Sequence, residues 1–124
     1  MTIHEAIALL DTLKPNQYGA SMKIDWLSVL DSQIYAELYQ THENCSPAAF
    51  TGYGEATPTD RELLVPFPYD RELYSFYLQS AVDRENGETA KYNQSVTLFN
   101  NAYLRFESWY NRSHLPLHSG AFQV

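Results

Sequence analysis

A periodic series of aromatic and aliphatic residues near the C-terminal end constrains the fold of this chain most strongly. Its members, separated by four, three, four, three and four residues, are Tyr92, Val96, Phe99, Tyr103, Phe106 and Tyr110. This is the heptad spacing of a helix that buries one narrow face. We therefore predict a long helix over residues 88–113, with these side chains forming its buried seam.

Capping signals and apolar periodicity predict three further helices, over residues 3–13, 22–42 and 70–85. Thr2 and Glu5 match a capping box at the start of the first, and Pro15 ends it. Gly87 closes the third helix, because glycine is common just past a helix end. We expect a single, mainly α domain, a small bundle of about four helices in two antiparallel pairs.

Residues 43–68 break the helical pattern with repeated proline and glycine. An unstructured connection of this length is uncommon inside a domain and is often functional. Two pieces, around residues 49–53 and 62–65, have extended character and could pair as a short β-hairpin.

The segment 115–124 cannot continue the last helix past Pro116, so we expect an extended tail. Its apolar residues need burial somewhere, and they are Leu115, Leu117, Phe122 and Val124. They could fold back on their own helices, or dock on a neighbouring subunit as an added strand or hook.

The charge of the chain excludes some classes of partner. The formal net charge is −7, and residues 1–68 alone hold nine acidic and three basic residues. With no basic stripe to neutralise phosphates, we expect no specific binding of nucleic acid. No apolar run approaches the roughly 20 residues that span a bilayer, and no signal peptide is evident, so we expect a cytoplasmic protein.

No pattern of reactive residues points to catalysis. His114 and His118 have the spacing of two metal ligands, but Pro116 lies between them. Cys45 lacks the surroundings of a cysteine nucleophile. We therefore expect no catalytic residue, no metal and no cofactor, and a protein that is not an enzyme.

Several short segments carry a resemblance to a known family. They are the turn 14–16 after the capped helix, and the segments 39–43, 50–53, 62–66, 68–70, 86–88 and 110–114. In their order and spacing, over nearly the whole chain, they resemble the head–tail connector (adaptor) proteins of tailed phages and of prophages in Gram-positive bacteria.

The resemblance implies a ring of subunits beneath the portal that extends the DNA channel. The implied partners are the portal protein and a tail-completion protein, with DNA only as passing cargo and no membrane. The implied location is the host cytoplasm during assembly, then the virion neck. We expect the tail (Leu115, Leu117, Phe122, Val124) to dock against the portal or a neighbouring subunit, and the loop (Phe50, Tyr53) to make a second contact. Asp11, Asp25, Asp31 and Glu37 would contribute a negative lumen.

A different class of function also fits the composition. The acidic face could cover a basic partner, which would make the chain a small cytoplasmic inhibitor or regulator. Such a protein would be a stable monomer or dimer that binds its partner in a salt-sensitive way.

Overall fold

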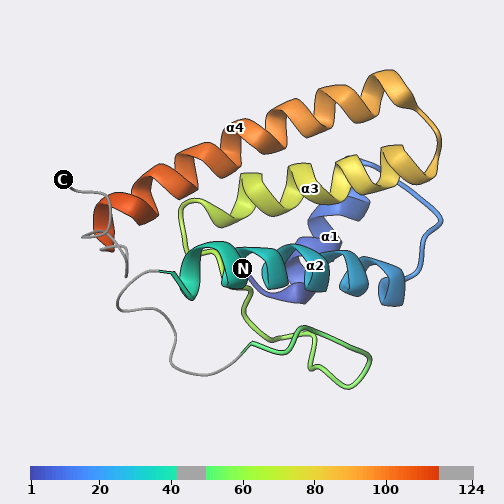
Figure 1. Ribbon diagram of the computed structural model, residues 1–124. Helices are drawn as coiled ribbons and strands as arrows, with labels where there is room; N and C mark the ends of the chain where they lie inside the picture. Colours follow the sequence, from blue (N-terminus) through green and yellow to red (C-terminus); the bar gives the residue numbers. More distant parts are fainter. Residues whose placement is uncertain (42–49, 115–124) are drawn as a thin grey trace.

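The computed structural model describes residues 1–41 and 50–114, and within these ranges the chain is helical with no β-strand (Figure 1). The helices are α1 (Ile3–Leu13), α2 (Ala20–Ile34), α3 (Asp70–Glu85) and α4 (Thr89–Ser113). A short π-helix, η1 (Tyr35–Tyr39), continues α2. The predicted mainly α bundle of four helices is therefore confirmed. No helix among the described residues is long and apolar enough to cross a membrane.

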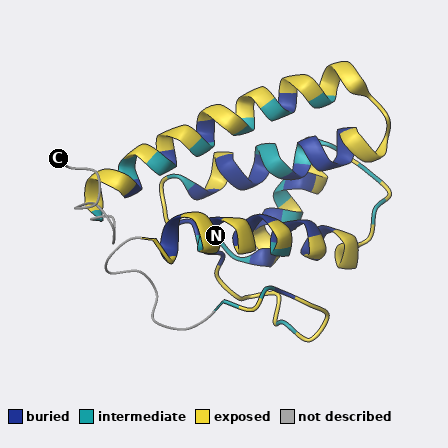
Figure 2. Cartoon of the chain, viewed as in Figure 1, coloured by how far each residue is buried: buried dark blue, intermediate teal, exposed yellow. Residues whose placement is uncertain are grey.

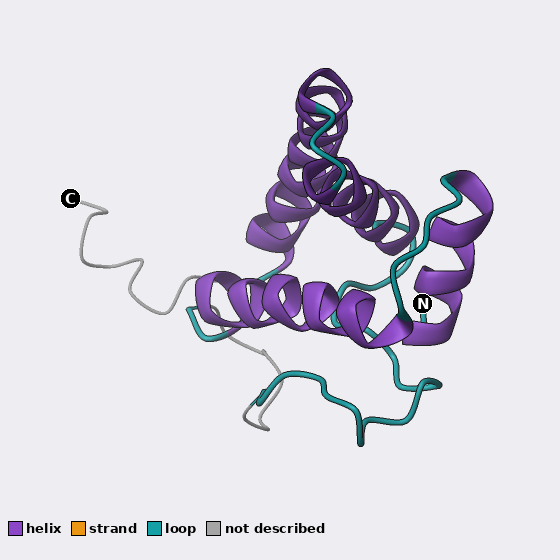
Figure 3. Ribbon diagram, turned by 90° about the vertical axis from the view of Figure 1, so that its right-hand side faces the viewer, coloured by secondary structure: helices purple, strands orange, loops and turns teal. Residues whose placement is uncertain are grey.

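α3 and α4 form an antiparallel hairpin and lie side by side along their lengths (Figures 1 and 3). Gly87 makes the tight reversal possible, because its φ of 72° lies in the left-handed region that favours glycine. Its N–H donates to the carbonyl of Arg84 at 3.1 Å.

The periodic face of α4 is its packed face. Phe106 and Tyr110 are buried, and the remaining predicted seam residues are half-buried. Ser95 and Ala102 are buried on the same face, where small side chains let α3 approach closely. Figure 2 shows most of the opposite face of α4 exposed along the helix.

α1 begins at the predicted capping box. Thr2 Oγ1 accepts the N–H of Glu5 at 3.1 Å, and the Glu5 carboxylate accepts the N–H of Thr2 at 2.9 Å. α1 crosses α2 and also packs on α3, with Ile3 and Leu10 fully removed from solvent (Figure 3).

Two sequence predictions need correction. The second helix starts at Ala20 and ends in the π turn at Tyr39, where the N–H of Gln40 donates to the carbonyl of Tyr35 at 2.9 Å. The hairpin between 49–53 and 62–65 does not form among the described residues, and Ala49 lies outside them. Glu62 instead makes an isolated antiparallel bridge with Thr2. The backbone groups of this part of the loop therefore form hydrogen bonds with the N-terminal backbone and not with a second strand.

Candidate interaction surfaces

A buried carboxylate forms hydrogen bonds that join the loop before α3 to the helices. Asp31 on α2 is fully buried and accepts hydrogen bonds from Tyr53 Oη at 2.5 Å and Tyr74 Oη at 2.6 Å. The backbone N–H of Leu64 donates to the same carboxylate at 3.1 Å. Tyr74 Oη also accepts the N–H of Val65 at 2.9 Å. We call Asp31, Tyr53, Tyr74 and the 64–65 backbone the Asp31 network. It joins α2, α3 and the loop.

The Asp31 network shifts the titration of its members. Burial raises the pKa of Asp31, although the hydrogen bonds from Tyr53 and Tyr74 oppose this by stabilising the carboxylate. Burial and the neighbouring Asp31 carboxylate raise the pKa values of both tyrosines, so both hydroxyls remain donors at neutral pH. Nothing in this arrangement prepares a nucleophile or a base, and its geometry is that of a structural clamp.

A second buried carboxylate ties the other end of the bundle together. Asp83 on α3 is fully buried and pairs with Lys14 Nζ at 2.6 Å, just after α1. Its other oxygen accepts the hydroxyl of Ser95 on α4 at 2.8 Å. α1, α3 and α4 therefore share one charged junction, which fixes their relative positions.

The residues predicted to form a negative lumen divide into two groups. Asp31 is buried and engaged in its network, so its assignment to a lumen was wrong. Asp11, Asp25 and Glu37 are exposed. The Asp11 carboxylate pairs with the buried Lys23 ammonium at 2.6 Å, which offsets part of its charge.

The two loop residues predicted to make subunit contacts are packed within the chain. Tyr53 is buried in the Asp31 network, so its assignment to an exposed interface was wrong. Phe50 is half-buried, with its ring 5.1 Å from that of Tyr53 and the Arg61 guanidinium 5.8 Å from its centre. The four apolar tail residues lie outside the described ranges, and their predicted role stays a prediction.

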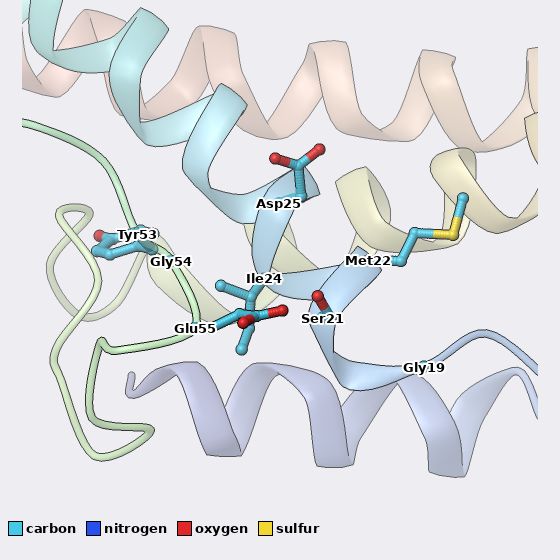
Figure 4. A pocket seen from close by; sticks show the side chains of 8 residues that line it. All are labelled: Gly19, Ser21, Met22, Ile24, Asp25, Tyr53, Gly54 and Glu55. Atoms are coloured by element: carbon cyan, nitrogen blue, oxygen red, sulfur yellow. The ribbon is translucent and has the colours of Figure 1, made fainter.

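An open pocket of about 560 Å³ lies between the first turns of α2 and loop residues 53–55 (Figure 4). Its lining includes two carboxylates, Asp25 and Glu55, and the Ser21 hydroxyl. The carboxylates point in different directions and do not converge on one position (Figure 4). No group of three or more potential metal ligands exists among residues 1–41 and 50–114. The described lining of the pocket therefore does not bring its two carboxylates together.

Two surface features were missed by the sequence analysis. Phe67 stands between Pro66 and Pro68 with 87% of its surface exposed. A groove of about 230 Å³ runs between α2 and α4, and we call it the α2–α4 groove. Its lining residues are Leu30, Gln33, Ile34, Glu37, Phe99, Asn100 and Tyr103. The two prolines that flank Phe67 are a sequence signal that could have identified it. The groove has no such signal, because tertiary packing brings its lining residues together.

No protein-family model, curated protein or solved structure matches this chain. The geometry of the described residues is therefore the basis on which function is inferred below, together with the resemblance noted in the sequence.

Proposed function

We propose that this chain is a structural subunit of a phage head–tail connector ring, which joins the portal to the tail and lines the DNA channel. The observation that carries the proposal is the Asp31 network, in which a buried carboxylate hydrogen-bonds loop residues Tyr53 and Leu64 and joins them to α2 and α3. Such a clamp suits a loop that presents a fixed surface to a neighbour. The choice of a connector among assembly proteins comes from the sequence resemblance.

Two exposed acidic residues, Asp25 of α2 and Glu37 of η1, support a role beside DNA. Asp25 and Glu37 lie on the surface, and no salt bridge involves either of them within the described residues. A channel that passes DNA needs walls that do not bind phosphate, and uncompensated carboxylates repel it.

The proposal is tested by mixing the protein with the portal protein encoded beside it and imaging the mixture by electron microscopy. We expect ring-shaped density added at one end of the portal. Asp31→Ala, which releases the loop, should reduce this density, while Asp25→Ala on the same helix should leave it unchanged. Bare portals beside free wild-type protein would refute the proposal.

The alternative is a small acidic module that inhibits or regulates a basic partner. The exposed carboxylates Asp25 and Glu37 favour it equally well. It requires a stable monomer or dimer whose capture of a basic protein weakens steeply as salt rises. An affinity that does not change between 50 mM and 300 mM salt, over which the Debye length shortens about 2.4-fold, would exclude it.

A further inference from the structure

Phe67 forms an apolar knob on a fixed backbone. It is the most exposed large apolar side chain that the structure describes. The chain on both sides is held in place: Val65 is buried, and the N–H of Tyr69 donates to the carbonyl of Pro66 at 3.0 Å. An exposed aromatic ring on an ordered turn loses little conformational freedom on docking, which is the character of an interface anchor.

The two carboxylates in the first turn of α3, close after Phe67 in the chain, are both paired: Asp70 with the N-terminal ammonium and Glu72 with Arg105. Arg71 is exposed in the first turn of α3, four residues after Phe67. Arg112 lines a shallow pocket with Tyr69, which follows Phe67 by two residues. Neither arginine makes a salt bridge within the part of the chain that the structure describes. Both are therefore available to an acidic partner.

The α2–α4 groove has the complementary character. Leu30 and Ile34 form a buried apolar floor, and the half-buried rings of Phe99 and Tyr103 form one wall. The exposed Glu37 carboxylate lies at its edge, 3.4 Å from Tyr103 Oη. An apolar cavity of about 150 Å³ accepts benzene, so a groove of about 230 Å³ has room for a phenyl ring.

The pocket that contains Tyr69, two residues after Phe67, and the α2–α4 groove lie on different sides of α4. The groove takes from α4 the residues Phe99, Asn100 and Tyr103. The pocket beside Tyr69 takes Leu104, Arg105, Ser108 and Arg112. At about 100° per residue of an α-helix, these two sets point in directions that differ by about 150°. Because Phe67 is only two residues from Tyr69, this separation fits a contact between two copies better than a contact within one.

We propose that Phe67 of one copy docks in the α2–α4 groove of a second copy, with Arg71 and Arg112 facing the acidic edge at Glu37. Because the two surfaces differ, the contact is heterologous, and its repetition builds a ring when the rotation between copies closes. The inference rests on the proposed ring and deepens it by naming the subunit contact.

Cross-linking between two single-cysteine proteins tests the contact. In a Cys45→Ser background, one protein carries Pro66→Cys, which leaves the adjacent Phe67 ring in place, and the other carries Asn100→Cys. After mixing, with and without portal, and mild oxidation, we expect the 66–100 heterodimer to exceed both homodimers at least fivefold. Predominant 66–66 homodimers would indicate a symmetric contact and would overturn the proposal, as would the absence of any 66–100 product under both conditions.

A second measurement keeps the test independent of the introduced cysteines. Sedimentation velocity on the full chain, alone and with portal, should show assembled species that Phe67→Ser removes. Leu13→Ser, which alters another exposed large apolar side chain, on α1, should leave them intact. Assembly that survives Phe67→Ser would overturn the proposal.

The outcomes distinguish a failure of this contact from a failure of the proposed function, and from occupation of the groove by residues 115–124. Portal binding by wild type without 66–100 cross-links would overturn the contact and leave the connector proposal standing. Cross-links without portal binding would support the contact and remove the connector. Cross-links that form only after removal of residues 115–124 would mean that the tail occupies the groove, which would overturn the contact in the full chain.

Discussion

Replacing Asp31 with alanine gives the sharpest test of how the loop is held. The substitution removes the acceptor for Tyr53 Oη, Tyr74 Oη and the Leu64 N–H, all at buried or half-buried positions. An orphaned buried donor costs about 1–3 kcal/mol. We take the low end of this range for each of the three donors, because removing the carboxylate also relieves its desolvation cost. The expected loss in unfolding free energy is then about 3 kcal/mol.

The measurement is urea unfolding followed by tryptophan fluorescence and far-ultraviolet circular dichroism. Asp25→Ala is the matched control, because Asp25 is exposed on the same helix, and surface substitutions usually change stability by about 0.5 kcal/mol or less. A loss for Asp31→Ala no larger than that of the control would refute the clamp.

A double-mutant cycle separates the network from a simple loss of packing. Tyr74→Phe removes one donor to Asp31 and the acceptor for the Val65 N–H, and should cost about 1–2 kcal/mol. In the double variant, Tyr74 no longer has an unsatisfied hydroxyl, so the two losses should fall short of additivity by about 1 kcal/mol. Strict additivity would show that Asp31 and Tyr74 do not act together.

The direction in which stability changes with pH tests the burial of Asp31 independently. Burial raises the pKa of Asp31, so the folded state holds its proton more tightly than the unfolded chain does. The resulting stability is present below the unfolded pKa and is lost as pH rises through the folded pKa. The advantage of wild type over Asp31→Asn should therefore shrink as pH rises from 4 towards 7, and an advantage that grows would contradict the assignment.

Three further predictions concern other parts of the chain. Gly52→Ala should lower the unfolding free energy by about 1–3 kcal/mol, because φ is 90° and the added Cβ would lie 2.7 Å from Ser28 Oγ. Gly54→Ala, which has open space around the added Cβ, should lower it far less in the same urea assay. The hydrogen bond from Lys23 lowers the pKa of Asp11, so the stabilisation that Asp11→Asn removes, about 1 kcal/mol or less, should be present at neutral pH and disappear as pH falls below about 4. Deleting residues 115–124 should abolish docking on the portal and keep cooperative melting by circular dichroism, whereas loss of the transition would place the tail in the core.

The helices could be predicted because their signals are local. The capping box at Thr2, the glycine at position 87 and the heptad face of α4 each act over a few residues. The π turn was missed because it depends on tertiary contacts: Tyr39 donates to the carbonyl of Leu64 at 2.7 Å and stacks on Tyr110.

The burial of Asp31 had a sequence signal, but the identity of its partners did not. Asp31 falls on the apolar stripe of α2, four residues after Leu27 and three before Ile34, where a core residue is expected. Tyr53 and Tyr74 lie 22 and 43 residues away in sequence, and only the folded loop brings them to it. Charge alone therefore assigned Asp31 to the surface, and the aromatic ring of Tyr53 alone assigned it to an interface.

The rigidity of the bundle bears on the kind of assembly it could build. The Asp31 network and the junction at Asp83 fix α2, α3 and α4 from two different points, and the α2–α4 groove and Phe67 both depend on those helices or on the turn beside them. A heterologous contact closes into a ring of one size only when the angle between its two surfaces is constant. Loosening Asp31 should therefore do more than lower stability: it should broaden the distribution of assembly sizes, even at temperatures where the variant remains folded.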